Sequence, residues 1–170
     1  RDLYKYDTIN EDTEFFGVVA DPVAHSYSPL IHNTAFAEKG LNARYFPFRV
    51  PKNDLSNLVD SCTALNISGL SVTIPHKEDA IEFCSQAESS ATGIGAVNTM
   101  VFQNTDCLGY NTDYRAAMDC IEEVFQIDKS QERPMQGLTA MVLGAGGVSR
   151  AIAWGLKQRH CDVVISSRTH

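Results

Sequence analysis

The stretch Met141-Val-Leu-Gly-Ala-Gly-Gly-Val-Ser-Arg150 decides the fold class of this chain. An apolar run over residues 138–143 leads into a glycine-rich loop at 144–147, and a helix-like pattern follows from about residue 148 to 159. Glycine lets the backbone turn tightly and approach a pyrophosphate, whose charge is met by free N–H groups at the start of a helix. The pattern predicts a dinucleotide-binding loop between a strand and a helix. An ordinary tight turn is the alternative, because glycine also serves there.

A second strand is expected at 162–166, about 20 residues beyond the loop, where an NAD site usually shows a carboxylate for the ribose 2′-hydroxyl. This chain has Ser167-Arg168-Thr169 there, and the guanidinium of Arg168 suits a 2′-phosphate. NADP is therefore favoured, with NAD as the alternative; a solvated arginine is the other interpretation of Arg168. Ser149 replaces the third glycine of the strict motif. The expected cofactor-binding residues are Gly144, Ala145, Gly146, Gly147, Val148, Ser149, Ser167, Arg168 and Thr169.

Composition excludes several classes of protein. The chain has 170 residues, 44% apolar side chains and a formal net charge of −7, which lacks the basic surface of a nucleic-acid binder. No apolar run is long enough for a membrane span or a signal peptide. The five cysteines are an odd number without C-x-x-C spacing, so neither a disulfide framework nor a metal site is expected. We expect a cytoplasmic protein, or a plastid protein if the source is a plant.

Strand-like and helix-like segments alternate along the chain, which favours α/β layers with right-handed crossovers. A polar stretch at 128–137 is the expected loop between two domains, and 86–95 is expected to be a loop. Strands are expected at 15–20, 43–50, 67–74, 96–102, 138–143 and 162–166, and helices at 28–40, 54–65, 75–84, 113–125 and 148–159.

Ser26 and Ser28 lie at the start of the first expected helix, where free N–H groups and the helix dipole favour an anion. A small carboxylate could bind there. Capping of the helix by Ser28 alone is an equally good explanation.

Lys77 follows Pro75, which is expected to begin a helix, so the lysine would lie at the helix end where cations are disfavoured. Such conflicts are enriched at functional sites, and a positive helix end would lower the pKa of the ammonium group. Asp113 is a good helix cap, yet beside Lys77 its carboxylate could hold the lysine and share its proton. An exposed lysine and a plain cap are the alternatives. The histidines at 25, 32 and 76 lack metal-ligand spacing.

Several ordered motifs together resemble shikimate dehydrogenase across nearly the whole chain. They are Asp21-Pro-Val-Ala-His-Ser-Tyr-Ser-Pro29, Ser71-Val-Thr-Ile-Pro-His-Lys77, Gly95-Ala-Val-Asn-Thr99, Gly109-Tyr-Asn-Thr-Asp113, Gly144-Ala-Gly-Gly-Val-Ser-Arg150 and Ser167-Arg-Thr169. The resemblance implies that Ser26 and Ser28 bind the substrate carboxylate, and that Thr73, Asn98 and Asp113 hold the ring hydroxyl groups. It also implies that Lys77 and Asp113 form the catalytic pair.

The resemblance further implies an α/β fold: a three-layer substrate domain with a mixed, mainly parallel sheet at 13–110, after an extension or linker at 1–12. The start of a Rossmann NADP-binding domain would follow at 111–170. The implied activity is NADPH-dependent reduction of 3-dehydroshikimate to shikimate, in the shikimate pathway to chorismate and the aromatic amino acids. The alternatives are an NAD-dependent quinate/shikimate dehydrogenase and a non-catalytic binding regulator.

Two departures from the family pattern are visible: Ser71 replaces a common Asn, and Ser167 replaces the Asn of Asn-Arg-Thr. The opening residues 3–13 resemble the junction after a dehydroquinate dehydratase domain in fused family members, and a homodimer is also open. Residues 138–166 form only two strands of a domain that normally has about six. We therefore expect an uncovered apolar face there, weak activity of this chain alone, and mobility or partner packing beyond about residue 128.

Overall fold

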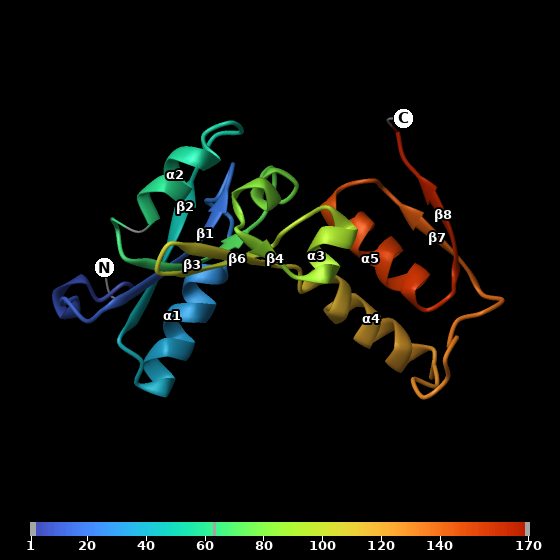
Figure 1. The fold of residues 1–170 in the computed structure, drawn as a ribbon. Coiled ribbons are helices and arrows are strands. Elements are labelled where there is room, and N and C mark those ends of the chain that lie inside the picture. The colour runs from blue at the N-terminus through green and yellow to red at the C-terminus, as the bar shows by residue number, and fades with distance from the viewer. Residues whose placement is uncertain (1–2, 63, 169–170) are drawn as a thin grey trace.

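A computed structural model describes residues 3–62 and 64–168 of the chain (Figure 1). The elements in chain order are η1 (Tyr6–Thr8), β1 (Glu14–Ala20), α1 (Ser28–Lys39), β2 (Ala43–Arg49), α2 (Leu55–Cys62), β3 (Ile67–Val72), η2 (Asp79–Phe83), β4 (Gln86–Ala87), α3 (Ser89–Ile94), β5 (Thr99–Gln103), β6 (Asp106–Tyr110), α4 (Asp113–Val124), β7 (Thr139–Leu143), α5 (Gly147–Gln158) and β8 (Asp162–Ser166). None of the helices described is both long and apolar enough to span a bilayer.

The first part of the chain forms a six-stranded sheet in the order β2-β1-β3-β5-β6-β4. The β1–β2, β1–β3 and β4–β6 pairs are parallel, whereas β5 runs antiparallel to both β3 and β6. The expected mixed, mainly parallel sheet is therefore confirmed. Because β5 runs in reverse, its first residue lies at the same edge of the sheet as the carboxyl ends of β1, β3 and β6.

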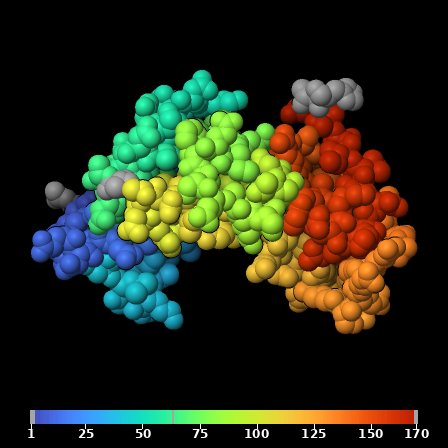
Figure 2. All heavy atoms as spheres, viewed as in Figure 1, coloured from blue at the N-terminus to red at the C-terminus, as the bar shows by residue number. Residues whose placement is uncertain are grey.

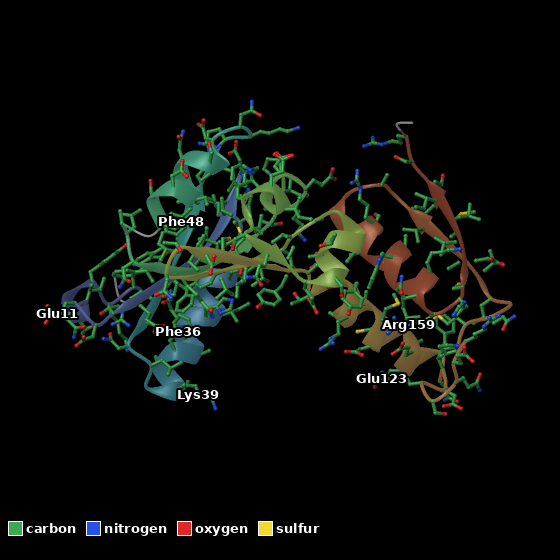
Figure 3. The ribbon with its side chains drawn as sticks, viewed as in Figure 1. Glu11, Phe36, Lys39, Phe48, Glu123 and Arg159 are labelled. Carbon is green, nitrogen blue, oxygen red and sulfur yellow. The ribbon has the colours of Figure 1, made fainter. Side chains whose placement is uncertain are left out.

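Helices cover both faces of this sheet, as the alternation of side chains along β1 requires. Phe15 packs into the core cluster beneath α2, whereas the ring of Phe16 lies 5.7 Å from that of Phe36 on α1. Figure 1 shows α1 and α2 on opposite sides of the strands, and Figure 3 labels Phe36. The result is a three-layer arrangement.

The last part of the chain folds as β7-α5-β8, with β7 and β8 parallel. Helix α4 packs against α5, and Gly155 permits this close approach, since a Cβ there would lie 2.7 Å from Cγ of Met118. The two sheets lie toward opposite ends of the molecule (Figures 1 and 2). The expected uncovered apolar face is present, because Met141, Leu143 and Val164, which share one face of the β7–β8 pair, are exposed.

A small apolar cluster, which we call the junction cluster, connects the two parts of the molecule. It contains buried Ile94, Ala96 and Ala151, with Tyr114 and Trp154 packed against them. The Tyr114 and Trp154 rings meet edge to face, with centroids 4.8 Å apart. The cluster joins α3 and the segment that follows it to α4 and α5.

Several expectations about local structure are wrong. Pro75 does not begin a helix: residues 75–78 form turns, and η2 begins only at Asp79. The carbonyl of Lys77 accepts a hydrogen bond from the Val97 N–H at 2.7 Å, so a tertiary contact replaces a helical one. The argument that placed Lys77 at a positive helix end therefore fails.

The stretch 86–95 is not a plain loop, and the structure contains a strand that the sequence pattern did not predict. Residues 86–87 form β4, and α3 ends at Gly95, whose φ of 72° favours glycine. Strand β6 follows the turn after β5 and pairs with it as a hairpin. Ser28 and Asp113 were expected to cap helices. Each is instead the first residue of its helix, α1 or α4, and neither helix has a side-chain cap.

Candidate active site

The predicted site residues gather at one edge of the six-stranded sheet. Ser26 and Ser28 follow β1, Thr73 and Lys77 follow β3, and Asp113 follows β6. Asn98 comes just before β5, the reversed strand, and so reaches the same edge. The topology thus brings residues from four separate segments together.

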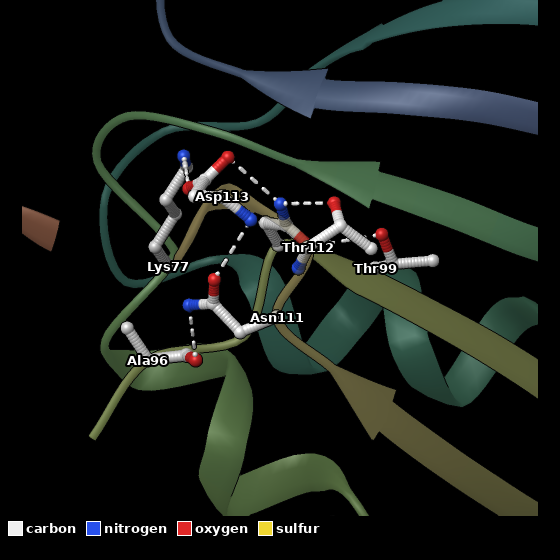
Figure 4. Close-up of polar contacts among 7 residues, drawn as sticks. Lys77, Ala96, Thr99, Asn111, Thr112 and Asp113 are labelled. Carbon is white, nitrogen blue, oxygen red and sulfur yellow. Dashed lines mark hydrogen bonds and ion pairs between the residues drawn. The ribbon is translucent and has the colours of Figure 1, made fainter. Parts of the chain in front are cut away.

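Lys77 and Asp113 form an ion pair at the centre of this edge (Figure 4). The Lys77 Nζ donates to Asp113 Oδ2 at 2.6 Å, and the two side chains are 13% and 24% exposed. A charge-assisted hydrogen bond of this length fixes the ammonium group while leaving both groups accessible from the cleft. The pair that the family resemblance implied is therefore in contact.

Asn98 holds the other oxygen of the same carboxylate. Its Nδ2 donates to Asp113 Oδ1 at 2.9 Å and to Thr112 Oγ1 at 2.9 Å. Its Oδ1 accepts hydrogen bonds from the hydroxyl of Thr99 and the N–H of Thr112. Asn98 thus fixes the Asp113 carboxylate, a role that its assignment as a substrate ligand did not include.

Asn111 is a positioning residue that the sequence reasoning missed. Its side chain is buried, donates to the Ala96 carbonyl at 2.9 Å and accepts from the Asp113 N–H at 3.1 Å (Figure 4). It therefore ties the start of α4 to the segment after α3. The signal was available, because an asparagine two residues before a helix start commonly bonds the backbone ahead of it.

Ser26 and Ser28 lie at the start of α1, where the Ser28 N–H donates to Ser26 Oγ at 3.3 Å. Tyr45, which no sequence argument singled out, is 3% exposed and its phenol oxygen is buried without a hydrogen-bond partner of good geometry. Burial raises the pKa of Tyr45, and the nearby hydroxyl groups of Ser71 and Ser28 oppose that rise. The hydroxyl groups of Tyr45 on β2, Ser71 on β3 and Ser28 on α1 therefore lie close together.

Thr73 and Lys77 lie on the loop that leaves β3, which backbone and side-chain bonds hold in place. The Thr73 N–H donates to the Val19 carbonyl, and the Thr73 carbonyl accepts from the His76 N–H. The buried His76 ring meets the Val50 carbonyl through Nε2 at 2.8 Å. His76, which the sequence left without a role, thus anchors the segment that carries Lys77.

The glycine loop between β7 and α5 has the backbone that a dinucleotide site needs. Gly144 has a φ of 110°, which other residues rarely adopt, and its N–H donates to the Ser166 carbonyl at 2.7 Å. A Cβ on Gly146 would meet no atom within 4 Å, so the loop is open to a ligand on that side. These residues fit a bound pyrophosphate.

A cavity of about 480 Å³ lies at the ends of β7 and β8 and is lined by Gly144, Ala145, Ser166, Ser167 and Arg168. No carboxylate lines it, and Arg168 is exposed at its rim. The geometry accommodates a ribose with a 2′-phosphate. Thr169, the remaining expected cofactor ligand, lies outside the described residues.

The glycine loop faces the Lys77 segment across a cleft of about 340 Å³. Thr73, Lys77 and Glu78 line one side of this cleft, and Gly146, Gly147 and Ser149 line the other. A Cβ added at Gly147 would lie 3.4 Å from Cδ of Lys77, so the loop closely approaches the lysine stem. Lys77 of the ion pair and the expected cofactor loop therefore line the same cleft.

Comparison with known proteins agrees with this arrangement. The family model described as "Shikimate dehydrogenase substrate binding domain" matches residues 18–100. The chain is 39% identical to a shikimate dehydrogenase (NADP(+)) of Pyrococcus furiosus over 161 residues, covering 95% of this chain and 56% of the relative. It is 36% identical over 177 residues to a chloroplastic bifunctional 3-dehydroquinate dehydratase/shikimate dehydrogenase of Arabidopsis thaliana, covering 99% of this chain and 29% of the relative.

A solved structure shows the same fold. It is the shikimate 5-dehydrogenase of Thermus thermophilus in complex with NADP(H) and shikimate, which is 31% identical with a TM-score of 0.77 and matches 92% of this chain and 56% of that one. The chain spans about half the length of most of the curated relatives it matches. Family model, relatives and solved structure agree with the site geometry, and they identify residues 18–100 as a shikimate dehydrogenase substrate-binding domain.

Proposed function

We propose that the protein carrying this chain reduces 3-dehydroshikimate to shikimate with NADPH. The observation that carries the proposal is the 2.6 Å ion pair between Lys77 and Asp113, whose lysine faces the glycine loop across one cleft. A hydride donor on the loop and an acid–base pair opposite it are what the reduction of a ring ketone requires.

Each site residue has a proposed role. Ser26 and Ser28 bind the substrate carboxylate, and Thr73, Asn98 and Asp113 hold the ring hydroxyl groups. Lys77 donates a proton to the ketone oxygen as negative charge develops there, and Asp113 holds and resupplies that proton. The bound nicotinamide supplies the hydride. The Tyr45 hydroxyl, beside Ser28, supports the placement of the serines at a carboxylate site.

We also propose the division into domains that the sequence suggested: an extension at 1–12, a substrate domain at 13–110, and a connecting helix with the first part of an NADP-binding domain at 111–170. The six-stranded sheet of β1–β6 and the separate β7–β8 sheet support this division. A homodimer and a fused dehydratase stay predictions. The fusion has support in the Arabidopsis relative, which is named as such a bifunctional protein.

We place the protein in the cytoplasm, or in the plastid if its source is a plant. The Arabidopsis relative is named as chloroplastic, which supports the second location for a plant source.

An assay of the complete natural protein tests the function. Oxidation of shikimate is followed by absorbance of the reduced cofactor, with NADP⁺ and NAD⁺ in parallel and with quinate as the competing substrate. We expect turnover with shikimate and a clear preference for NADP⁺. A preference for NAD⁺ with equal use of quinate would favour the quinate/shikimate alternative, and binding of shikimate without turnover would favour a binding regulator.

The carboxylate site is tested with the same assay. Ser26→Ala and Ser28→Ala each remove a hydroxyl donor worth about 1 to 3 kcal/mol, so we expect KM for shikimate to rise about 5- to 100-fold. Ser61→Ala, on the surface helix α2, is the matched control. Unchanged KM in both site variants would remove the carboxylate assignment.

A further inference from the structure

An ion pair crosses the cleft beside the proposed catalytic lysine. Glu78 immediately follows Lys77, and Arg150 is the fourth residue of α5. The Arg150 Nη2 lies 3.1 Å from Glu78 Oε2. Among the ion pairs of the described residues, it alone links α5 to the Lys77 segment.

The position of Arg150 is unfavourable within its own helix. A cation in the first turn of a helix is disfavoured by the helix dipole, and the first turn of α5 contains no acidic residue. Glu78 supplies the missing negative charge from the opposite side of the cleft. The unfavourable position of Arg150 is therefore explained by its ion pair with Glu78 and not by interactions within α5.

Two contacts connect this ion pair to the reacting groups. Gly147, at the start of α5, closely approaches the Lys77 stem, since a Cβ added to this glycine would lie 3.4 Å from Cδ and 3.5 Å from Cβ of the lysine. The Lys77 ammonium group in turn binds Asp113. The junction cluster holds the two parts of the molecule together beyond the cleft, so the ion pair is a second attachment, close to the reacting groups.

We infer that Glu78 and Arg150 are a positioning pair, which holds the glycine loop at a fixed distance from Lys77 and so sets the geometry of hydride transfer. The inference rests on the proposed dehydrogenase function. Neither residue contacts the reacting atoms in this role. Both side chains are about half exposed, at 45% and 47%, so the pair contributes modestly.

A different role for Arg150 makes the opposite prediction. If Arg150 bound the cofactor pyrophosphate directly, then Glu78 would compete with the cofactor for it. Arg150→Gln would then raise KM for the cofactor, and Glu78→Gln would lower it. A positioning pair instead requires both variants to lower kcat, because each breaks the same contact.

The experiment is a double-mutant cycle on the complete natural protein with Glu78→Gln, Arg150→Gln and the double variant. We expect each single variant to lower kcat about 2- to 5-fold, with KM for shikimate unchanged. The double variant should be no slower than either single one, because the contact can be lost only once. The reversed pair, Glu78→Arg with Arg150→Glu, should regain kcat at saturating cofactor. Asp79→Asn and Lys157→Gln, on η2 and α5, are the matched controls.

Hydrogen exchange supplies a readout that does not depend on turnover. The backbone amides of residues 74, 76–78 and 144–150 should exchange faster in both single variants than in the wild type and in the two controls. If the wild type turns over shikimate but the single effects multiply in the double variant, the positioning inference is wrong. Opposite shifts of cofactor KM would likewise overturn it in favour of a pyrophosphate ligand. If the wild type has no activity, the proposed function fails, and unchanged exchange in the variants would then reject the contact itself.

Discussion

Lys77 and Asp113 lie 36 residues apart in the chain, yet their side chains form the shortest hydrogen bond of the proposed site. Asn98 binds the second oxygen of the Asp113 carboxylate, so both carboxylate oxygens are hydrogen-bonded. The fixed carboxylate in turn orients the Lys77 ammonium group. A positioned acid–base pair typically contributes about 10²- to 10⁴-fold to a proton-transfer step. The chemistry at the residue scale therefore depends on a small network with fixed geometry.

We predict that Lys77→Ala lowers kcat of the complete protein about 10²- to 10⁴-fold, because the proton donor is lost. KM for shikimate should change much less. Lys52→Ala, which removes an exposed lysine, is the control and should leave kcat unchanged. Steady-state kinetics measure both, with circular dichroism to show that the variant is folded. Wild-type kcat in folded Lys77→Ala would reject the catalytic assignment.

Arg168 is predicted to distinguish the two cofactors. Arg168→Ala should raise KM for NADPH at least about 10-fold, because a charge-assisted bond to the 2′-phosphate is lost, while KM for NADH should hardly change. The ratio of the two KM values is the measured quantity. Arg133→Ala, in the loop before β7, serves as control. Equal effects on both cofactors would make Arg168 a solvated arginine, the alternative that the sequence left open.

At the scale of elements, a buried charge holds α4 to the end of α5. Glu122 on α4 is 4% exposed and pairs with Arg159 and, at 2.8 Å, with Lys129 (Figure 3 labels Arg159). Burial acts to raise the pKa of Glu122, but the hydrogen bonds from Lys129 and Arg159 outweigh it, so the pKa is lowered below its ordinary 4.5. A carboxylate with a lowered pKa stabilises the folded state above its unfolded pKa.

We predict that Glu122→Gln lowers the free energy of unfolding by about 1 to 3 kcal/mol at pH 7, because Arg159 loses its charged partner. The difference from wild type should shrink as pH falls from about 4.5, where the carboxyl of the unfolded chain becomes protonated, through the lower pKa of the folded carboxyl. Urea unfolding at several pH values measures this difference, with Glu123→Gln on the same helix as control. A difference that stays constant down to pH 3 would contradict the ion-pair explanation.

At the scale of the whole molecule, the two sheets are joined by the junction cluster, and the cleft opens beside it. A Cβ on Gly93 of α3 would lie 2.3 Å from Nε1 of Trp154 on α5, so only glycine permits this approach. Trp154 is also the single tryptophan of the chain, which makes its fluorescence a direct probe of the junction.

We predict that Gly93→Ala destabilises the protein by about 1 to 3 kcal/mol through overpacking of the junction. Trp154 should move, so its emission maximum should shift, and kcat should fall with it because the two sides of the cleft are displaced. Thr92→Ala, at an exposed neighbouring position, is the control. Unchanged fluorescence and unfolding midpoint in Gly93→Ala would show that the junction tolerates the added methyl group.

The sequence by itself determined what depends on local pattern. Glycine spacing after an apolar run identified the β7-α5 loop, and the order of short motifs identified the family and the Lys77–Asp113 pair. Short apolar runs also placed most strands of the larger sheet, because a strand that is covered on both faces gives a continuous apolar run.

Only the tertiary structure decided what depends on contacts between distant segments. Pro75 begins no helix, because the Lys77 carbonyl is bound by Val97. The bond from Asn111 to Ala96, the approach of Tyr45 to Ser28 and Ser71, and the Glu78–Arg150 pair became visible only when the fold had brought these partners close. The physical reason is that hydrogen bonds and ion pairs act over a few ångströms in space, whereas a sequence pattern reports only neighbours along the chain.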